Sequence, residues 1–132
     1  MLITKLQKGN YILLLMLLIS TGVLFSCYKN KYPECKIVSP ANGQTFTAPE
    51  VITVTAEMHD DGDALTSEYL FVINQNSLND TIVNVRQEDF LFGKYILTRS
   101  FTSNPNTTYK IVAYAYGNHG NSKTDSILIK AN

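Results

Sequence analysis

Residues 107–130 read TTYKIVAYAYGNHGNSKTDSILIK, and this stretch decides the fold. Residues 108–116 and 122–130 each alternate their side chains with a period of two, as β-strands with one buried face do. Between them, the segment 117–121 consists of two glycines, two asparagines and a histidine, a composition typical of a hairpin turn. The stretch therefore predicts two antiparallel strands joined by a hairpin.

Five further runs upstream have the same period and are rich in Val, Ile, Thr, Tyr and Phe. They occupy residues 36–38, 51–58, 65–74, 81–86 and 95–102. No stretch after residue 27 has a helical period, so no helix is predicted that could cross over between parallel strands. Seven short strands in about 100 residues predict an all-β, antiparallel sandwich.

The alternation also predicts the core and the order of the strands. The run 65–74 is apolar on both faces, which predicts a central strand, whereas the shorter run 81–86 is typical of an edge. Nine side chains are predicted to lie inside: Ile52, Val54, Tyr69, Phe71, Leu97, Tyr109, Ile111, Ile127 and Ile129.

The N-terminus has the layout of an export signal. Lys5 and Lys8 precede an apolar run over residues 11–25, which is shorter than the ~20 residues that a membrane-spanning helix needs. The exit from this run, Leu24-Phe25-Ser26-Cys27, resembles the lipobox of bacterial lipoproteins, and in particular those of the Bacteroidetes.

This resemblance implies a helical signal peptide over residues 1–26, removal of that peptide, and a diacylglycerol on Cys27. Residues 27–35 are then the lipidated cysteine and a short tether, and residues 36–132 are the domain. The tether reaches at most about 25 Å when fully extended. Two alternatives stay open: a retained signal anchor, or ordinary cleavage followed by a disulfide between Cys27 and Cys35.

The charge balance excludes one class of partner. The chain has 11 basic and 11 acidic residues, and the mature part keeps nine of the basic residues and all of the acidic ones, for a net charge of −2. A nucleic-acid-binding protein needs a basic surplus to displace counterions from phosphate. No nucleic-acid partner is therefore expected.

Other motifs resemble bacterial immunoglobulin-like (Ig-like) domains. In residues 39–46, SPANGQTF forms an opening Pro-x-Asn-Gly turn, and the strand after it ends in the acidic loop His59-Asp60-Asp61-Gly62-Asp63. Residues 107–116 are similar to the last hairpin of fibronectin type III modules, in which Tyr109 takes the place of the corner tyrosine. The resemblance implies a single Ig-like sandwich. The sequence departs from antibody domains, because it lacks a tryptophan for the core position and the inter-sheet cysteine pair.

One group of residues is a candidate ligand or metal site. It comprises His59, Asp60, Asp61, Asp63 and His119. In an Ig-like sandwich the two loops that carry these residues lie at the same end. Imidazoles with carboxylates suit zinc, and carboxylates with carbonyls suit calcium. The alternative is a polar loop that keeps Asp and Gly for turn geometry and solubility, and no metal or other cofactor is predicted.

Other candidates for chemistry are weaker. No Gly-x-Ser-x-Gly turn is present, Glu88-Asp89 is interpreted as exposed charge, and Cys35 is interpreted as a passive thiol, because no helix start or basic cluster adjoins it. Tyr69, Tyr114, Tyr116 and the segment 90–92 offer either an aromatic binding patch or ordinary packing.

The sequence thus predicts a non-enzymatic, lipid-anchored protein of the cell envelope whose Ig-like domain contacts another protein or a glycan. A small metal- or thiol-dependent periplasmic enzyme and a passive spacer are the alternatives. Tyr28 is not the aspartate associated with inner-membrane retention, and no acidic run like a surface-export tag follows Cys27. Both observations favour the outer membrane and its periplasmic side.

Overall fold

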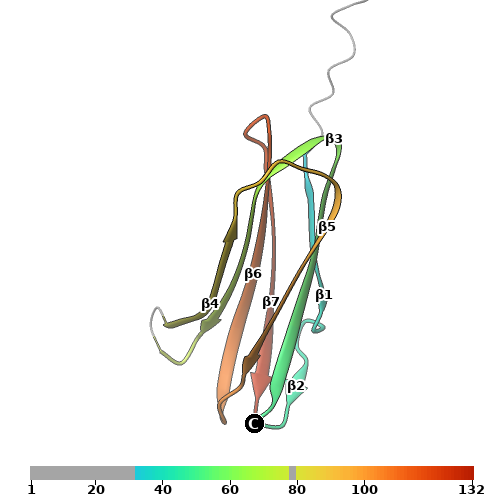
Figure 1. The fold of residues 1–132 in the computed structure, drawn as a ribbon. Coiled ribbons are helices and arrows are strands. Elements are labelled where there is room, and N and C mark those ends of the chain that lie inside the picture. Colours follow the sequence, from blue (N-terminus) through green and yellow to red (C-terminus); the bar gives the residue numbers. More distant parts are fainter. Residues whose placement is uncertain (1–31, 78–79) are drawn as a thin grey trace, which may run out of the picture. The chain divides into compact units, whose positions relative to one another are not determined.

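The computed structural model describes residues 32–77 and 80–132, which form an all-β domain in one curled, seven-stranded sheet (Figure 1). The strands are β1 Glu34–Ser39, β2 Thr45–Phe46, β3 Val51–Asn74, β4 Asp80–Gln87, β5 Leu91–Thr102, β6 Thr107–Gly117 and β7 Ser122–Ala131. The predicted signal peptide and Cys27 lie outside the described residues. Within those residues, no helix is long and apolar enough to cross a membrane.

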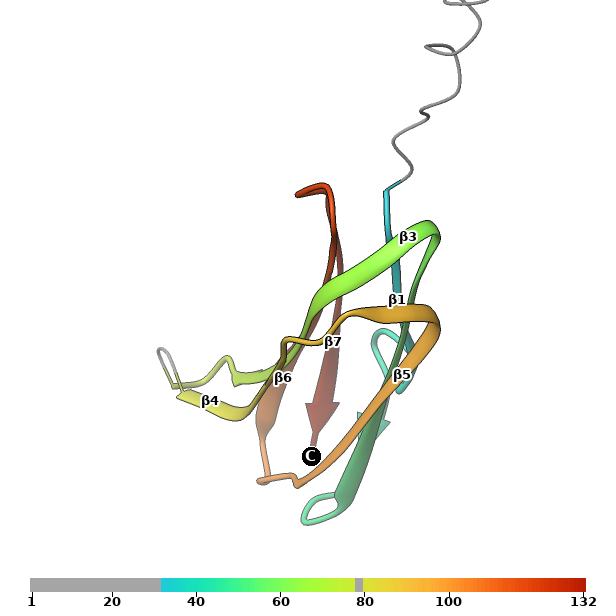
Figure 2. The same ribbon diagram turned by 45° about the horizontal axis from the view of Figure 1, so that its top comes forward.

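Strand β3 organises the fold because it belongs to both halves of the sheet. Its first part, up to Asp60, pairs with β1 and β5, and its second part, from Leu65, pairs with β4 and β6. Both pairings shift register between residues 60 and 67, where the strand bends (Figure 2). The prediction of two separate strands over 51–58 and 65–74 is therefore wrong, since the segment between them continues as one bent strand.

The remaining pairings complete an Ig-like sandwich. Strand β7 pairs with β6 in antiparallel register, and the short β2 closes the edge beyond β7 in parallel. Strand β4 pairs only with β3 among the described elements, which confirms the predicted edge, and the second part of β3 lies centrally between β4 and β6. The antiparallel prediction is thus confirmed except for the two-residue parallel contact of β2.

Seven of the nine predicted core residues are buried between the two halves of the sheet. These are Ile52, Val54, Leu97, Tyr109, Ile111, Ile127 and Ile129. The placement of Tyr69 and Phe71 in the core is wrong, because both are half-buried while Leu70 and Val72 on the opposite face of β3 are fully buried. The aromatic side chains of this strand therefore lie on the outer surface of the domain.

Local turn chemistry fixes both ends of β6. The buried Tyr109 accepts a hydrogen bond at its hydroxyl from the Asn104 backbone N–H at 2.7 Å, which confirms the predicted corner tyrosine. At the other end, the hairpin 117–121 closes with a bond from the Gly117 N–H to the Asn121 carbonyl, and Gly120 has a φ of 77° that favours glycine. The hairpin and the bend of β3 meet at one end of the domain, because the Asn118 N–H bonds to the Ala64 carbonyl.

Candidate functional site

The structure brings the five residues of the predicted metal site to this one end but divides their contacts. His59 Nε2 lies 3.3 Å from Asp61 Oδ1 and 3.6 Å from Glu34 Oε2, beside β1. His119 Nε2 lies 2.8 Å from Asp63 Oδ2, beside the hairpin of β6 and β7. The two imidazoles thus have separate carboxylate partners.

The carboxylates at this end also shape the backbone. Asp60 Oδ1 accepts the Gly62 N–H at 3.1 Å, and Asp63 Oδ1 accepts the Ala64 N–H at 2.8 Å. A Cβ on Gly117 would lie 2.9 Å from Asp60 Oδ2, so Asp60 packs against the hairpin. Within residues 32–77 and 80–132, no group of three or more His, Cys, Asp and Glu side chains is arranged to hold a metal ion. The arrangement favours turn geometry as the role of these aspartates.

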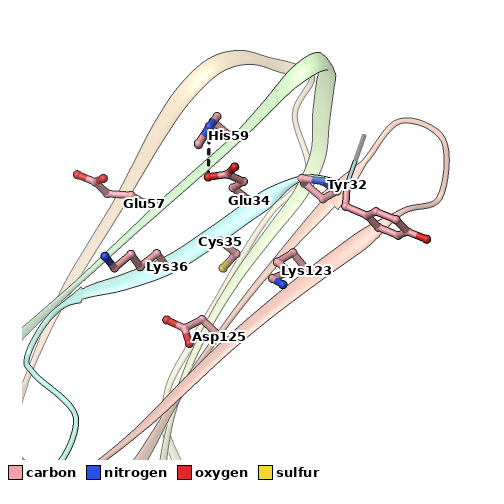
Figure 3. Close-up of a pocket in the computed structure, with 9 residues that line it drawn as sticks. Tyr32, Glu34, Cys35, Lys36, Glu57, His59, Lys123 and Asp125 are labelled. Atoms are coloured by element: carbon pink, nitrogen blue, oxygen red, sulfur yellow. Dashed lines mark ion pairs between the residues drawn. The ribbon is translucent and has the colours of Figure 1, made fainter. Parts of the chain in front are cut away.

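A groove of about 630 Å³ that the sequence did not indicate opens between β1 and β7 (Figure 3). Nine residues line it: Tyr32, Pro33, Glu34, Cys35, Lys36, Glu57, His59, Lys123 and Asp125. It exists because β1 pairs with β3 and not with β7. Asp125 Oδ2 accepts the Ile37 N–H at 2.8 Å and so ties the two strands together across this seam.

The thiol in this groove is unsuited to nucleophilic chemistry. Cys35 is only 7% exposed, and burial raises the pKa of its thiol to about 11. Because the thiolate is the reactive form, a thiol with this pKa is almost entirely protonated at neutral pH. Both properties agree with the interpretation of Cys35 as a passive thiol.

A third candidate is an aromatic strip on the outer face of β3 and β6, defined by Tyr69, Phe71, Tyr114 and Tyr116. The ring centroids of Tyr69 and Tyr116 are 5.7 Å apart and those of Phe71 and Tyr114 are 6.0 Å apart, both in edge-to-face geometry. Tyr69 and Phe71 have nearly parallel rings 6.1 Å apart. The four side chains line a shallow surface hollow of about 250 Å³.

The register of β3 and β6 explains this strip. Tyr69 lies directly opposite Tyr114, so Phe71 and Tyr116 are their diagonal neighbours on the same face, within reach of aromatic side chains. On the β4 side, Arg86 lies opposite Tyr69 and its guanidinium carbon is 5.4 Å from the ring centroid. The strip is therefore an ordered array of rings on the outer face of β3 and β6.

Sequence reasoning found this surface only in part. It named Tyr69, Tyr114 and Tyr116 as a possible binding patch but assigned Phe71 to the core and added the segment 90–92. Phe90 and Phe92 are 67% and 80% exposed, and they make no ring contact with the strip among the described residues. The signal that could have found Phe71 is its two-residue spacing from Tyr69.

The outer face of the other half of the sheet differs in character. Hydroxyl side chains meet across β3 and β5, with Thr53 Oγ1 2.8 Å from Ser100 Oγ and Thr55 Oγ1 3.4 Å from Thr98 Oγ1. Ile96, which is 53% exposed, is an apolar side chain on this face and lies opposite Glu57. The aromatic strip thus distinguishes one face of the sandwich from the other.

Comparison with known proteins agrees with this architecture. A family model described as a bacterial Ig domain matches residues 33–119. No curated protein matches the chain.

Solved structures share the fold at low sequence identity. A superoxide reductase (neelaredoxin) from Ignicoccus hospitalis has a TM-score of 0.56 and 11% identity, over 77% of this chain and 81% of that chain. A structure of fibronectin(III)-like modules of Clostridium thermocellum CbhA has a TM-score of 0.50 and 16% identity, over 76% of this chain and 47% of that chain. A chain of the complex of zinc 2-glycoprotein and prolactin-inducible protein from human seminal plasma has a TM-score of 0.56 and 10% identity, over 81% of this chain and 99% of that chain. These likenesses establish the fold alone.

Proposed function

The chain belongs to the bacterial Ig domain family, and from this premise we propose that it is a non-catalytic, lipid-anchored binding module of the cell envelope. The aromatic strip is the observation that carries the proposal. Its four rings give a large contact area at a low cost in side-chain entropy, because each ring has only two rotatable bonds and is already held by its neighbours. The partner of this strip is a glycan or another protein.

The surroundings of the strip favour a glycan. Its neighbours in register are neutral and polar, since Ser67 and Ser122 flank Tyr116, and Thr124 lies beside Tyr114. Arg86 is the charged neighbour, and it forms an ion pair with Glu88. A hollow of about 250 Å³ lies below the usual range of pockets that enclose a small ligand, about 300–1,000 Å³. Flat contact with a neutral sugar chain fits both properties.

The position of the strip suits a module anchored through its N-terminus. Glu34 at the start of β1 is in register with His59, near the bend of β3, whereas Asn132 lies at the opposite end of the domain (Figure 1). An anchor at Cys27 would hold the first end close to the membrane and leave the side faces of the sandwich open. A partner would then approach the strip from the side.

We expect replacement of two strip residues, Tyr69→Ser and Tyr116→Ser, to weaken glycan binding about tenfold for each ring removed. The measurement is retardation in affinity gels that contain purified envelope polysaccharides or peptidoglycan. Ile96→Ser is the matched control, because it removes an exposed apolar side chain from the opposite face. Equal retardation of the double variant and the control would refute the strip as the contact surface, and retention by an envelope protein alone would assign the partner to the protein class.

Anchoring is tested separately. In cells labelled with a fatty acid, we expect the wild-type chain to incorporate the label and to fractionate with the outer membrane, facing the periplasm. Cys27→Ala should abolish the label and release the protein from that fraction, because the thiol is the attachment point for the lipid. Cys35→Ala is the control and should leave both properties unchanged, since this thiol is buried in the seam between β1 and β7. Unlabelled wild-type protein would contradict the anchor.

A further inference from the structure

We propose that the segment running from the β4–β5 connection into the start of β5 contacts the lipid bilayer, with Phe90 and Phe92 lying in its interfacial layer. This inference rests on the proposed lipid anchor at Cys27. It concerns a surface that is separate from the aromatic strip, and its occupant is the phospholipid of the membrane that holds the anchor.

Exposure is the first observation. Phe92 is 80% exposed and Phe90 is 67% exposed, although Leu91 between them packs against the core. Gly93 follows within β5 and has a φ of 80°, which favours glycine. Leu91 thus holds the start of β5 against the core, and the phenyl rings on either side of it are left in solvent. Paired exposed aromatic rings are unusual for a surface that contacts only water.

Position is the second observation. Register places Glu34 opposite His59 and His59 opposite Lys94, so the start of β1, the bend of β3 and the start of β5 lie at the same end of the domain (Figure 2). The Phe92 backbone is one residue from Gly93, which pairs with Asp60 at the bend. The chain enters the domain at this end, through the exposed Tyr32.

The tether supplies the argument for the occupant. Four residues separate Cys27 from Tyr32, so the fully extended chain spans at most about 18 Å between their Cα atoms. A lipid on Cys27 therefore keeps this end of the domain within that distance of the headgroups. At such proximity, even a weak preference of two phenyl rings for the interface becomes an intramolecular contact with a high effective concentration.

The two carboxylates just before Phe90 have partners, since Glu88 pairs with Arg86 and Asp89 Oδ2 accepts a hydrogen bond from Gln87 Nε2 at 3.1 Å. Lys94 Nζ lies 2.8 Å from Glu57 Oε2, and the carboxylates of Asp61 and Asp63 face the imidazoles of His59 and His119. Among the described residues, these pairs leave no basic cluster that would select anionic lipid. Insertion should therefore depend on the aromatic rings and occur equally in zwitterionic and anionic membranes.

The chain contains no tryptophan, so a single introduced indole reports on one position. Mature, lipidated Phe92→Trp protein is purified from membranes and reconstituted into phosphatidylcholine vesicles with and without brominated acyl chains. Val51→Trp is the matched control, since Val51 is also apolar and 65% exposed but begins β3, nine residues before Asp60 and about 30 Å away along the strand.

We expect the emission of Phe92→Trp to shift to shorter wavelength and to be quenched by bromine several-fold more than that of Val51→Trp. Equal quenching of the two variants, with acyl mass confirmed on Cys27, would overturn the membrane contact and leave the proposed anchor intact. Absence of acyl mass on Cys27 would overturn both. Phe90→Trp provides a second reporter and should behave like Phe92→Trp.

Discussion

A Glu68→Met variant is expected to gain about 3 kcal/mol in stability relative to the wild-type protein as the pH is raised from 4 to 8. Glu68 shares the inner face of β3 with Leu70 and Val72, is fully buried, and has neither carboxylate oxygen hydrogen-bonded within the described part of the chain. Burial raises the pKa of this carboxyl from 4.5 to about 7, and the Asp89 carboxylate adds to the rise. The charged form is thus disfavoured in the folded protein.

The sign of the pH dependence follows from this raised pKa. Below pH 4.5 the carboxyl is protonated in the folded and the unfolded chain, so its titration costs no stability there. Between pH 4.5 and about 7 the folded state holds a proton that the unfolded state releases, and the wild-type protein therefore loses stability as the pH rises. Above about pH 7 the loss is complete. Methionine has no such dependence and suits the surrounding apolar face.

Urea denaturation of both proteins at a series of pH values measures this difference. Glu68→Gln is the control that removes the charge but keeps the shape and polarity of the side chain, and its stability should also lose the dependence between pH 4.5 and 7. If the stability of the wild-type protein and that of Glu68→Met changed with pH in parallel, the Glu68 carboxylate would be solvated or paired in solution.

Ile111→Ala is expected to reduce the free energy of unfolding by about 2 to 5 kcal/mol. Ile111 is fully buried at the centre of β6, where it lies in register with Val72 on one side and Ile127 on the other. Truncation leaves a cavity between strands that cannot close without breaking their register. We therefore expect a loss in the upper half of this range. Such a loss is a large share of the ~5–15 kcal/mol that stabilises a domain.

The midpoint of urea denaturation reports this change. Lys110→Ala is the matched control, because Lys110 is the exposed neighbour of Ile111 and its truncation should alter stability by no more than about 0.5 kcal/mol. An unchanged midpoint for Ile111→Ala would show that β6 turns its other face to the core.

Much of the fold could be predicted because its signals are local. The period of two located β1 and β4–β7 to within a few residues, divided β3 into two strands and missed the two-residue β2. The Gly- and Asn-rich segment 117–121 located the hairpin. The corner role of Tyr109 came from resemblance to a known motif, and its hydrogen bond to Asn104 bears this out. Turn residues and alternation act over a few positions, so the chain reveals them without its partners.

The candidate sites were less predictable because they depend on residues distant in sequence. His59 and His119 do lie at one end, but their imidazoles have separate carboxylate neighbours, Glu34 and Asp63. The groove between β1 and β7 was missed, since no sequence pattern indicates that β1 pairs with β3 and leaves a seam beside Asp125.

The sequence by itself determined an all-β chain of antiparallel strands with a neutral to acidic mature domain, because alternation, turn residues and charge are properties of short segments. Only the tertiary structure decided which face of residues 65–74 lies inside. Both faces are apolar enough to be buried, and one of them also carries Glu68. The pairing with β6 decided the matter, because it sets Leu70 opposite Ala113 and Val72 opposite Ile111 inside and leaves Tyr69 opposite Tyr114 on the surface.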